Sequence, residues 1–306
     1  MSFSSDVRKE LCAAVNPNRH CQLAELSAII NASCEISPSN MTLHTENELV
    51  ARRFQRLLIE IFQIAAPESL QKNTRAVSIT NGAQALKILK ATGCILENGS
   101  AKKDVSPAVV MDNCCKRAYV RGSFIACGTI SDPFKTYHLE FSLPPPDNER
   151  LAAKLSGVLK VFGLKPKTLT RKSHALVYIK ESDNIADALI IMEAPKSLLK
   201  LENVRIEKDL RNSVNRQVNF ETANLNKTVG AAVGQIEDIR YIERRVGLGQ
   251  LSENLEEVAR LRLKYEAASL KEIGSMLSNP VGKSGVNHRL RKISEIAENL
   301  RREEMI

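Results

Sequence analysis

Two segments of the chain repeat each other at an offset of 94 residues. The first begins at Cys21 and ends at Ile36, and the second begins at Cys115 and ends at Ile130. Both place small and apolar residues along one helical face, and both end in a short β-prone stretch. An internal duplication constrains the fold more than any overall composition value, because the two copies are expected to form the same structural unit.

The elements that follow each segment also share one order. An alternating strand comes next, then an amphipathic helix, a β-rich piece and a last helix. The paired copies of the strand, the helix start and the β-rich piece are residues 41–45 and 137–143, 47–51 and 148–152, and 75–80 and 175–180. The pattern predicts an α+β fold in which the order α-β-β-α-β-β-α occurs twice, in repeats at residues 1–110 and 111–202.

Small residues form a stripe along the first helix of each copy. The stripes consist of Ala24, Ala28 and Ala32 in the first copy and Ala118, Gly122 and Ala126 in the second. Such stripes let two helix backbones approach closely. We expect these two helices to pair at the centre of a pseudo-twofold saddle flanked by two antiparallel sheets. The alternative is that each stripe faces only the sheet of its own copy.

The remainder of the chain has a helical pattern. Apolar residues recur at helical spacing from Leu210 to Ile236. An Asn-rich stretch interrupts them, and because Asn is a modest helix former and a good turn residue, we expect a break near Thr222. Residues 203–221 are then a connecting helix, and residues 222–306 are a separate all-α domain.

A helix-turn-helix pattern occupies about residues 269–301 of that domain. Ser269 and Glu272 have the spacing of a capping box, which opens a short helix. A turn with a proline and a glycine follows, and a second helix begins at Ser284. This arrangement is typical of proteins that place the second helix in the major groove of DNA.

The second helix of this motif has an apolar face and a polar face. Its apolar face consists of Val286, Leu290, Ile293 and Ala297. The predicted DNA-binding residues on or beside the other face are Lys283, Ser284, Asn287, His288, Arg289, Arg291 and Lys292. Arg291 has the chemistry to hold guanine O6 and N7, and Asn287 to pair with adenine N6 and N7. The lysines and Arg289 are expected to touch phosphate. The alternative is a basic helix that is merely solvated.

The whole chain resembles the WhiA family. The most specific stretches are Arg211-Asn212-x-Val214-Asn215-Arg216 with the segment 221–228, and the segment 283–292. The resemblance implies a degenerate LAGLIDADG-like domain followed by a helix-turn-helix domain similar to the promoter-reading region of sigma factors. It also implies a DNA-binding regulator of transcription, sporulation, cell division and chromosome segregation. RNA polymerase or a sigma factor are then candidate protein partners, and the oligomeric state is left open.

The repeated segments themselves resemble the paired motifs of LAGLIDADG homing endonucleases, which end in an acidic residue that holds the catalytic divalent metal. This resemblance places Ser33 and Cys127 at the two catalytic positions. Neither residue supplies the carboxylate oxygen that Mg²⁺ prefers. We therefore expect that the nuclease activity has been lost and that the protein is not an enzyme. An active metal-dependent endonuclease is the less favoured alternative.

Charge and cysteine content agree with an intracellular DNA-binding protein. The net charge of +9 suits a polyanionic partner such as double-stranded DNA. Aromatic residues make up only 4% of the chain and Trp is absent, which argues against binding single strands by base stacking. The seven Cys show no spacing suited to zinc, so we expect reduced thiols, no metal, no cofactor and a cytoplasmic, nucleoid-associated location. No apolar run is long enough to span a membrane.

A further alternative concerns the saddle. In this alternative the saddle is a docking surface for a protein or a small ligand, and DNA binding is confined to the C-terminal domain. Basic residues of the first repeat are then either phosphate contacts or solvated side chains; they are Arg52, Arg53, Arg56, Lys72 and Arg75.

Overall fold

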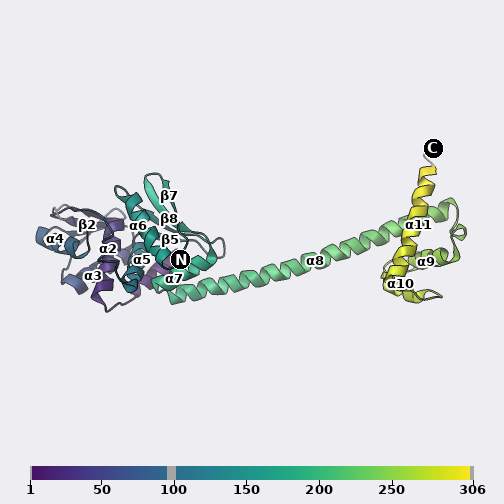
Figure 1. Cartoon of the computed structure of the whole chain (residues 1–306), viewed down its shortest axis with the longest axis horizontal. Coiled ribbons are helices and arrows are strands. Elements are labelled where there is room, and N and C mark those ends of the chain that lie inside the picture. The colour runs from purple at the N-terminus through teal and green to yellow at the C-terminus, as the bar shows by residue number, and fades with distance from the viewer. Residues whose placement is uncertain (1, 95–100, 304–306) are drawn as a thin grey trace. The chain divides into compact units, whose positions relative to one another are not determined.

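The computed structural model describes residues 2–94 and 101–303. The chain divides into two compact units, Met1–Asp209 and Leu210–Ile306. Each unit has its own core of buried apolar side chains. Figure 1 labels the elements of both units.

The first unit contains the predicted duplication, and the order α-β-β-α-β-β-α is confirmed in both copies. The first copy consists of α2 (Arg19–Ser33), β1 (Cys34–Ile36), β2 (Met41–Thr45), α3 (Glu48–Phe62), β3 (Glu68–Gln71), β4 (Thr74–Ile79) and α4 (Gly82–Ala91). The second consists of α5 (Asn113–Cys127), β5 (Gly128–Ile130), β6 (Leu139–Leu143), α6 (Asn148–Val161), β7 (Lys167–Arg171), β8 (His174–Ile179) and α7 (Ser182–Met192). An additional helix, α1 (Phe3–Ala13), precedes them and was not predicted.

Each copy builds one antiparallel sheet of four strands. The strand orders are β1-β2-β4-β3 and β5-β6-β8-β7. The register is equivalent in the two sheets, since Met41 lies opposite Ile79 and Leu139 lies opposite Ile179. All four of these side chains are buried. Alternate residues of β2 and β6 therefore face the core, as period-two strands require.

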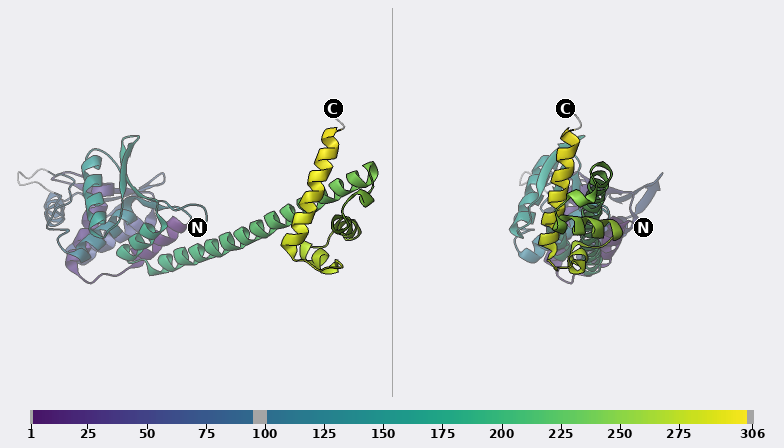
Figure 2. Two further views of the ribbon diagram at one scale, coloured as in Figure 1. Left: turned by 45° about the vertical axis from the view of Figure 1, so that its right-hand side comes forward. Right: turned by 90° about the vertical axis from the view of Figure 1, so that its right-hand side faces the viewer.

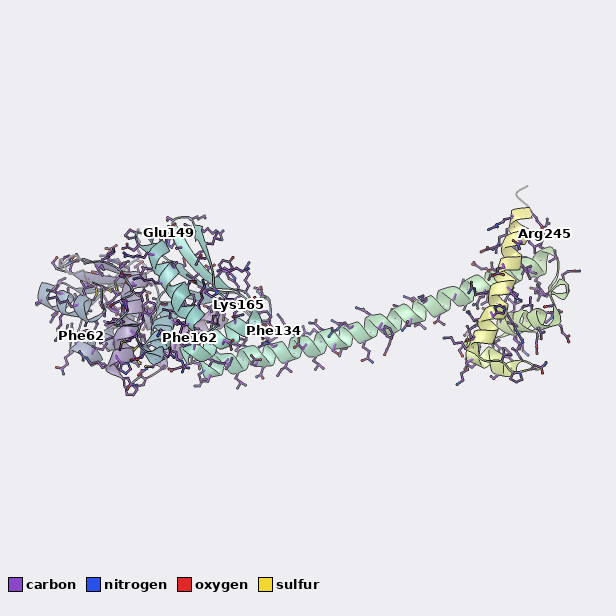
Figure 3. All side chains as sticks on the ribbon, viewed as in Figure 1. Phe62, Phe134, Glu149, Phe162, Lys165 and Arg245 are labelled. Carbon is purple, nitrogen blue, oxygen red and sulfur yellow. The ribbon has the colours of Figure 1, made fainter. Side chains whose placement is uncertain are left out.

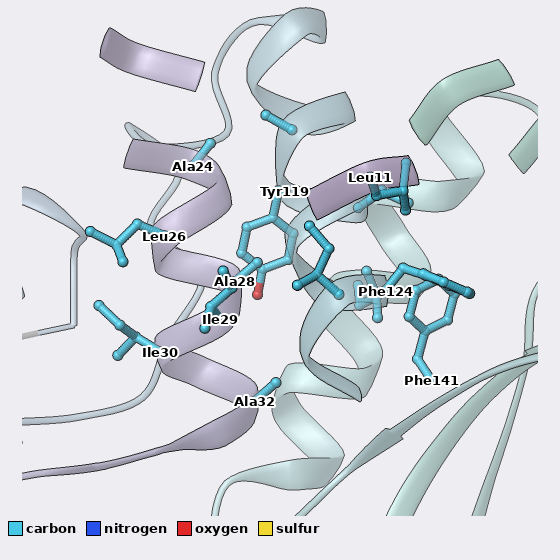
Figure 4. Close-up of a cluster of buried hydrophobic side chains, with 14 of the residues drawn as sticks. Leu11, Ala24, Leu26, Ala28, Ile29, Ile30, Ala32, Tyr119, Phe124 and Phe141 are labelled. Atoms are coloured by element: carbon cyan, nitrogen blue, oxygen red, sulfur yellow. The ribbon is translucent and has the colours of Figure 1, made fainter. Parts of the chain in front are cut away.

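The two small-residue stripes meet at the centre of the first unit, so the predicted pairing of α2 with α5 is confirmed (Figure 1). Figure 4 shows Ala24, Ala28 and Ala32 along α2, with the Tyr119 side chain of α5 close to Ala28. A Cβ atom on Gly122 would lie 2.9 Å from the Cβ of Ala28 and would overlap the carbonyl oxygen of Glu25. Only glycine therefore permits this approach of the two backbones.

A second equivalence appears where α3 and α6 end. Phe62 is the last residue of α3, and Phe162 is the residue that follows α6; both are labelled in Figure 3. The guanidinium of Arg19 lies 5.8 Å from the centre of the Phe62 ring, and that of Arg117 lies 6.0 Å from the Phe162 ring. The repeats thus share an aromatic side chain under a cation, a favourable contact of the cation–π type.

A single helix, α8 (Pro195–Arg245), runs across the division between the units. The predicted break near Thr222 is wrong, because α8 continues through it. The Asn residues there only weakly disfavour a helix, and neither glycine nor proline occurs between Pro195 and Gly230. Side chains support the helix locally, as Gln217 donates to Glu221 over 3.0 Å.

The second unit is helical, as predicted. The C-terminal part of α8 is followed by the short 3₁₀ helix η1 (Leu248–Gln250), α9 (Glu253–Lys264), α10 (Leu270–Met276) and α11 (Lys283–Glu303). Figure 2 shows α11, in yellow, beside the shorter helices of this unit. Its core consists of Ile239, Ile242, Leu248, Leu251, Val258, Ala259, Ile273, Leu277, Val286, Leu290, Ile293 and Ala297.

Candidate nucleic-acid interface

The short helix α10 begins with the predicted capping box. The backbone N–H of Ser269 donates to Oε2 of Glu272 over 2.7 Å, and the backbone N–H of Glu272 donates to the Ser269 hydroxyl over 3.3 Å. Hydrogen bonding of the Glu272 carboxylate to the backbone N–H and then to the side chain of Ser269 holds the pKa of Glu272 below its ordinary value. Two backbone donors that a helix start leaves unpaired are thereby satisfied.

The turn between α10 and α11 lies directly against Gly274. The Val281 amide donates to the Gly274 carbonyl over 3.1 Å. A Cβ atom on Gly274 would overlap the Val281 carbonyl oxygen and would lie 3.1 Å from a methyl group of Val286. The absence of a side chain at Gly274 thus lets the turn fold back onto α10, and this sets where α11 begins.

A carboxylate from α9 fixes the start of the same turn. Oε1 of Glu257 accepts hydrogen bonds from the Ser278 amide and from the Ser278 hydroxyl, each over 2.6 Å. These bonds are the main cause that lowers the pKa of Glu257, and the positive charge of Arg289 adds to it. Glu257 thereby joins α9 to the turn between α10 and α11.

The two faces of α11 are as predicted. Val286, Leu290, Ile293 and Ala297 are all buried against the core of the second unit. Six of the seven predicted DNA-binding residues are exposed: Lys283, Ser284, Asn287, His288, Arg291 and Lys292. Within the described residues, no side-chain hydrogen bond or ion pair engages these six. Their polar groups are therefore available to a ligand in solvent.

Arg289 differs from the other predicted contacts. Its side chain is only half exposed, and its charge acts on Glu257 of α9. The phosphate contact expected of Arg289 stays a prediction. Between Lys283 and Ile293 the helix carries no acidic residue, so the exposed face has a positive potential.

The basic residues considered for the saddle are largely engaged within the first unit. Arg53 is buried and donates to Glu25, and Arg56 donates to the Ala14 carbonyl over 2.8 Å. Arg52 pairs with Glu48, and Arg75 pairs with Glu48 and Glu68. Of the five, Lys72 alone has no ion pair among the described residues. Burial therefore withholds Arg53 from phosphate, whereas the pairs of Arg52, Arg56 and Arg75 are at least partly exposed to solvent.

Ser33 and Cys127 are the last residues of α2 and α5, immediately before β1 and β5. Both side chains are half-buried, and the Cys127 thiol donates to the Ser123 carbonyl over 3.3 Å. Burial raises the pKa of Cys127 to about 12. A neutral thiol and a hydroxyl are poor ligands for a hard divalent cation. The assignment of these positions as former catalytic sites stays an interpretation.

Two groups of polar residues were missed in the sequence. Glu25 is fully buried in α2 between Arg53 and Arg121, and its only trace in the sequence is one acidic residue within an apolar helical run. The second group brings His20 and Cys21 together with the adjacent Cys114 and Cys115. The spacing of the cysteines did not reveal this group, because His20 and Cys21 come from one repeat and Cys114 and Cys115 from the other. The two pairs nevertheless occupy matching positions at the offset of 94 residues.

Three family models match the chain one after another. They describe the WhiA N-terminal LAGLIDADG-like domain (residues 19–91), the WhiA LAGLIDADG-like domain (residues 116–211) and the WhiA C-terminal HTH domain (residues 214–297). The chain belongs to the WhiA family. The resemblance noted from the sequence is thereby confirmed.

Curated WhiA relatives match over nearly their whole length. The probable cell division protein WhiA of Lachnoclostridium phytofermentans is 44% identical over 315 residues, which cover 98% of this chain and 100% of the relative. That of Alkaliphilus oremlandii is 45% identical over 317 residues, which cover 98% of each chain. The crystal structure of full-length DUF199/WhiA from Thermatoga maritima has the same fold, with a TM-score of 0.58, 23% identity, and coverage of 98% of this chain and 99% of that one.

The combination of a LAGLIDADG-like saddle with a helix-turn-helix domain is therefore that of WhiA proteins. Among the described residues of this WhiA chain, no helix combines the length and the apolar character needed to cross a membrane.

Proposed function

We propose that this WhiA protein is a sequence-specific regulator that binds double-stranded DNA through α11, acts in transcription, cell division and chromosome segregation, and has lost endonuclease activity. The exposed face of α11 is the observation that carries the proposal. It presents cationic and amide side chains without internal partners, while the opposite face is buried behind a capped helix and a tight turn. A major-groove helix has these properties.

The residues of this face divide into two roles. In this proposal Arg291 donates two hydrogen bonds to guanine, and Asn287 makes a bidentate contact with adenine. Each such contact discriminates against a wrong base by about 1–3 kcal/mol. Lys283, Lys292 and Ser284 lie at the start of α11 or beside the base-reading side chains, where phosphate contacts orient the helix in the groove.

Genome-wide occupancy of the full chain tests this division, combined with binding to recovered sites at several salt concentrations. We expect the Arg291→Ala variant to alter the preferred sequence. We expect Lys292→Ala to weaken binding to all sites and to reduce the salt slope by roughly 1. Arg260→Ala is the matched control, because Arg260 is an exposed arginine of the same unit that pairs with Glu256 on its own helix.

The proposal fails if Arg291→Ala and Arg260→Ala have the same sites and the same affinity. In that case α11 is not the reader, and the saddle or a partner protein must select the sites. The variant in which Lys283, Arg291 and Lys292 are all changed to Ala addresses the saddle directly. Salt-sensitive DNA binding that survives in this variant assigns DNA contact to the saddle.

Loss of endonuclease activity is tested separately with supercoiled plasmid and Mg²⁺. We expect no nicking by the full chain, because Ser33 and Cys127 supply no carboxylate for the metal. Nicking that disappears when both residues are changed to Ala would show that the activity is retained.

A further inference from the structure

Four side chains with metal-binding atoms meet in the first unit. They are His20, Cys21, Cys114 and Cys115, which we call the His/Cys cluster. The Nδ1 atom of His20 and the three Sγ atoms all lie within 4.8 Å of one another. Cys21 and Cys115 are buried, whereas His20 and Cys114 are exposed. The cluster is thus anchored in the core and still accessible to an ion from solvent.

The distances within the cluster are close to those of a tetrahedral metal site. His20 Nδ1 lies 3.1 Å from the Cys115 sulfur, 3.4 Å from the Cys21 sulfur and 3.9 Å from the Cys114 sulfur. With Zn–S bonds near 2.3 Å and Zn–N bonds near 2.0–2.1 Å, tetrahedral ligands place nitrogen and sulfur roughly 3.5 Å apart. The three observed separations bracket this value, so small side-chain movements suffice to seat an ion.

We propose that the His/Cys cluster binds one zinc ion as a structural site. Three thiolates and one imidazole form a ligand set that is common for structural zinc. Four protein ligands fill a tetrahedral coordination shell and leave no position for water or substrate, which distinguishes such a site from a catalytic one. Each coordinating thiol gives up its proton to solvent when the ion binds.

The place of the cluster in the fold defines what the ion does. His20 and Cys21 lie in the first turn of α2, and Cys114 and Cys115 lie in the first turn of α5. Each repeat therefore supplies two ligands, and the ion joins the N-terminal ends of the paired helices. Ser33 and Cys127 are at the other ends of the same helices. The site is thus at the opposite end of these two helices from the former nuclease positions.

Metal analysis of the full chain, purified under reducing conditions, is the first test. We expect about one zinc per chain by elemental analysis. After removal of zinc with a chelator, Co²⁺ should restore a site whose visible absorption is typical of tetrahedral cobalt with thiolate ligands. Removal of zinc should also lower the melting temperature of the first unit, because binding to the folded state stabilises it.

Variants identify the ligands. Cys114→Ser changes an exposed ligand and is the least disturbing to the core, and His20→Ala removes the nitrogen ligand. We expect both to weaken Co²⁺ binding by more than about tenfold, since loss even of supporting contacts costs 10- to 100-fold. Cys127→Ala is the matched control, because it removes a thiol from the other end of α5 and should leave Co²⁺ binding unchanged.

Three results would overturn the proposal. One is wild-type protein, purified under reducing conditions, that holds no stoichiometric zinc and gives no tetrahedral cobalt spectrum. Protein that under the same conditions carries a disulfide between Cys114 and Cys21 or Cys115, found by mass spectrometry, overturns the proposal as well. The third is unchanged metal affinity in both Cys114→Ser and His20→Ala. Circular dichroism of each variant establishes that it is folded. The outcome is independent of DNA binding, because Arg291→Ala should keep the zinc.

Discussion

The buried carboxylate of Glu25 provides the most stringent test of how the first unit is held together. Glu25 has no exposed surface, and its carboxylate lies between two guanidinium groups that are themselves almost fully buried. Arg53 donates to it over 2.5 and 2.9 Å, and Arg121 donates over 2.9 Å. The perturbation we consider is Glu25→Ala, which removes the anion and leaves both cations in the core.

The magnitude follows from what remains for the two arginines. Breaking a buried ion pair by removing one partner costs about 3–5 kcal/mol, because the remaining charge is buried without compensation. Arg121 keeps Glu193, at 2.6 Å, but that carboxylate is 52% exposed and is therefore a weaker partner. Among the described residues, Arg53 then keeps the Ala14 carbonyl alone as a hydrogen-bond acceptor. We therefore expect the upper part of the range. In a unit of this size each kcal/mol lowers the melting temperature by about 2–4 °C, so a loss of about 4–5 kcal/mol gives a decrease of roughly 8–20 °C.

Differential scanning calorimetry of the full chain measures this decrease in the transition of the first unit. Glu193→Gln is the matched control, since it removes the exposed member of the same network and should cost less than about 1 kcal/mol. Equal melting temperatures for Glu25→Ala and Glu193→Gln would refute the reasoning. Such a result would mean that water enters the space beside Arg53 and Arg121 and compensates their charges.

Two further predictions concern the second unit. Gly274→Ala should destabilise it by about 1–3 kcal/mol, because the new Cβ meets the Val281 carbonyl and backbone cannot move aside cheaply; denaturant unfolding and DNA affinity check this. Gly230→Ala is its control, because nothing lies within 4 Å of a Cβ there, and it should stabilise its helix by roughly 0.5–1 kcal/mol. The pKa values of Glu257 and Glu272 lie below their ordinary value of 4.5, so the stability that both provide is present above that pH and is lost as the pH falls through their folded values. Calorimetry from neutral pH to below 4.5 should show this loss, with a weaker pH dependence in Glu272→Gln; an unchanged dependence would contradict the assignment.

Most of the fold could be predicted because its determinants are local and occur twice. The alternation from Met41 to Thr45 defines a strand by itself, and the same pattern one repeat later supports it. The Ala28 and Gly122 stripes predicted the helix pair, because small residues at matching positions have a direct steric use. The helix-turn-helix was equally accessible, since a capping box at Ser269 and a two-faced helix are short-range patterns.

The missed features depend on contacts between distant segments. The break expected near Thr222 was predicted from the helix propensity of Asn, which is too weak to end a helix in a stretch without glycine or proline. Arg53 was considered a phosphate contact, because nothing in its own helix reveals that Glu25, 28 residues earlier, binds it in the core. The His/Cys cluster was missed for the same reason. Its two pairs of residues are far apart in the sequence, and the packing of α2 on α5 brings them together.

The charges at the centre of the saddle also bear on why the two repeats belong to one chain. The position equivalent to Glu25 in the second repeat is Tyr119, and the position equivalent to Arg121 in the first repeat is Ser27. The helix backbones are therefore paired symmetrically while the charges are not. Two copies of the first repeat would keep the pair of Glu25 with Arg53 but would lack the hydrogen bond from Arg121. Two copies of the second repeat would leave Arg121 with the half-exposed Glu193 as its carboxylate partner. Each arrangement thus lacks the buried ion pair between Glu25 and Arg121 that joins the two central helices. The central helix pair is thus stabilised by an ion pair between residues that differ in the two repeats. This stabilisation does not depend on any catalysis at the helix ends.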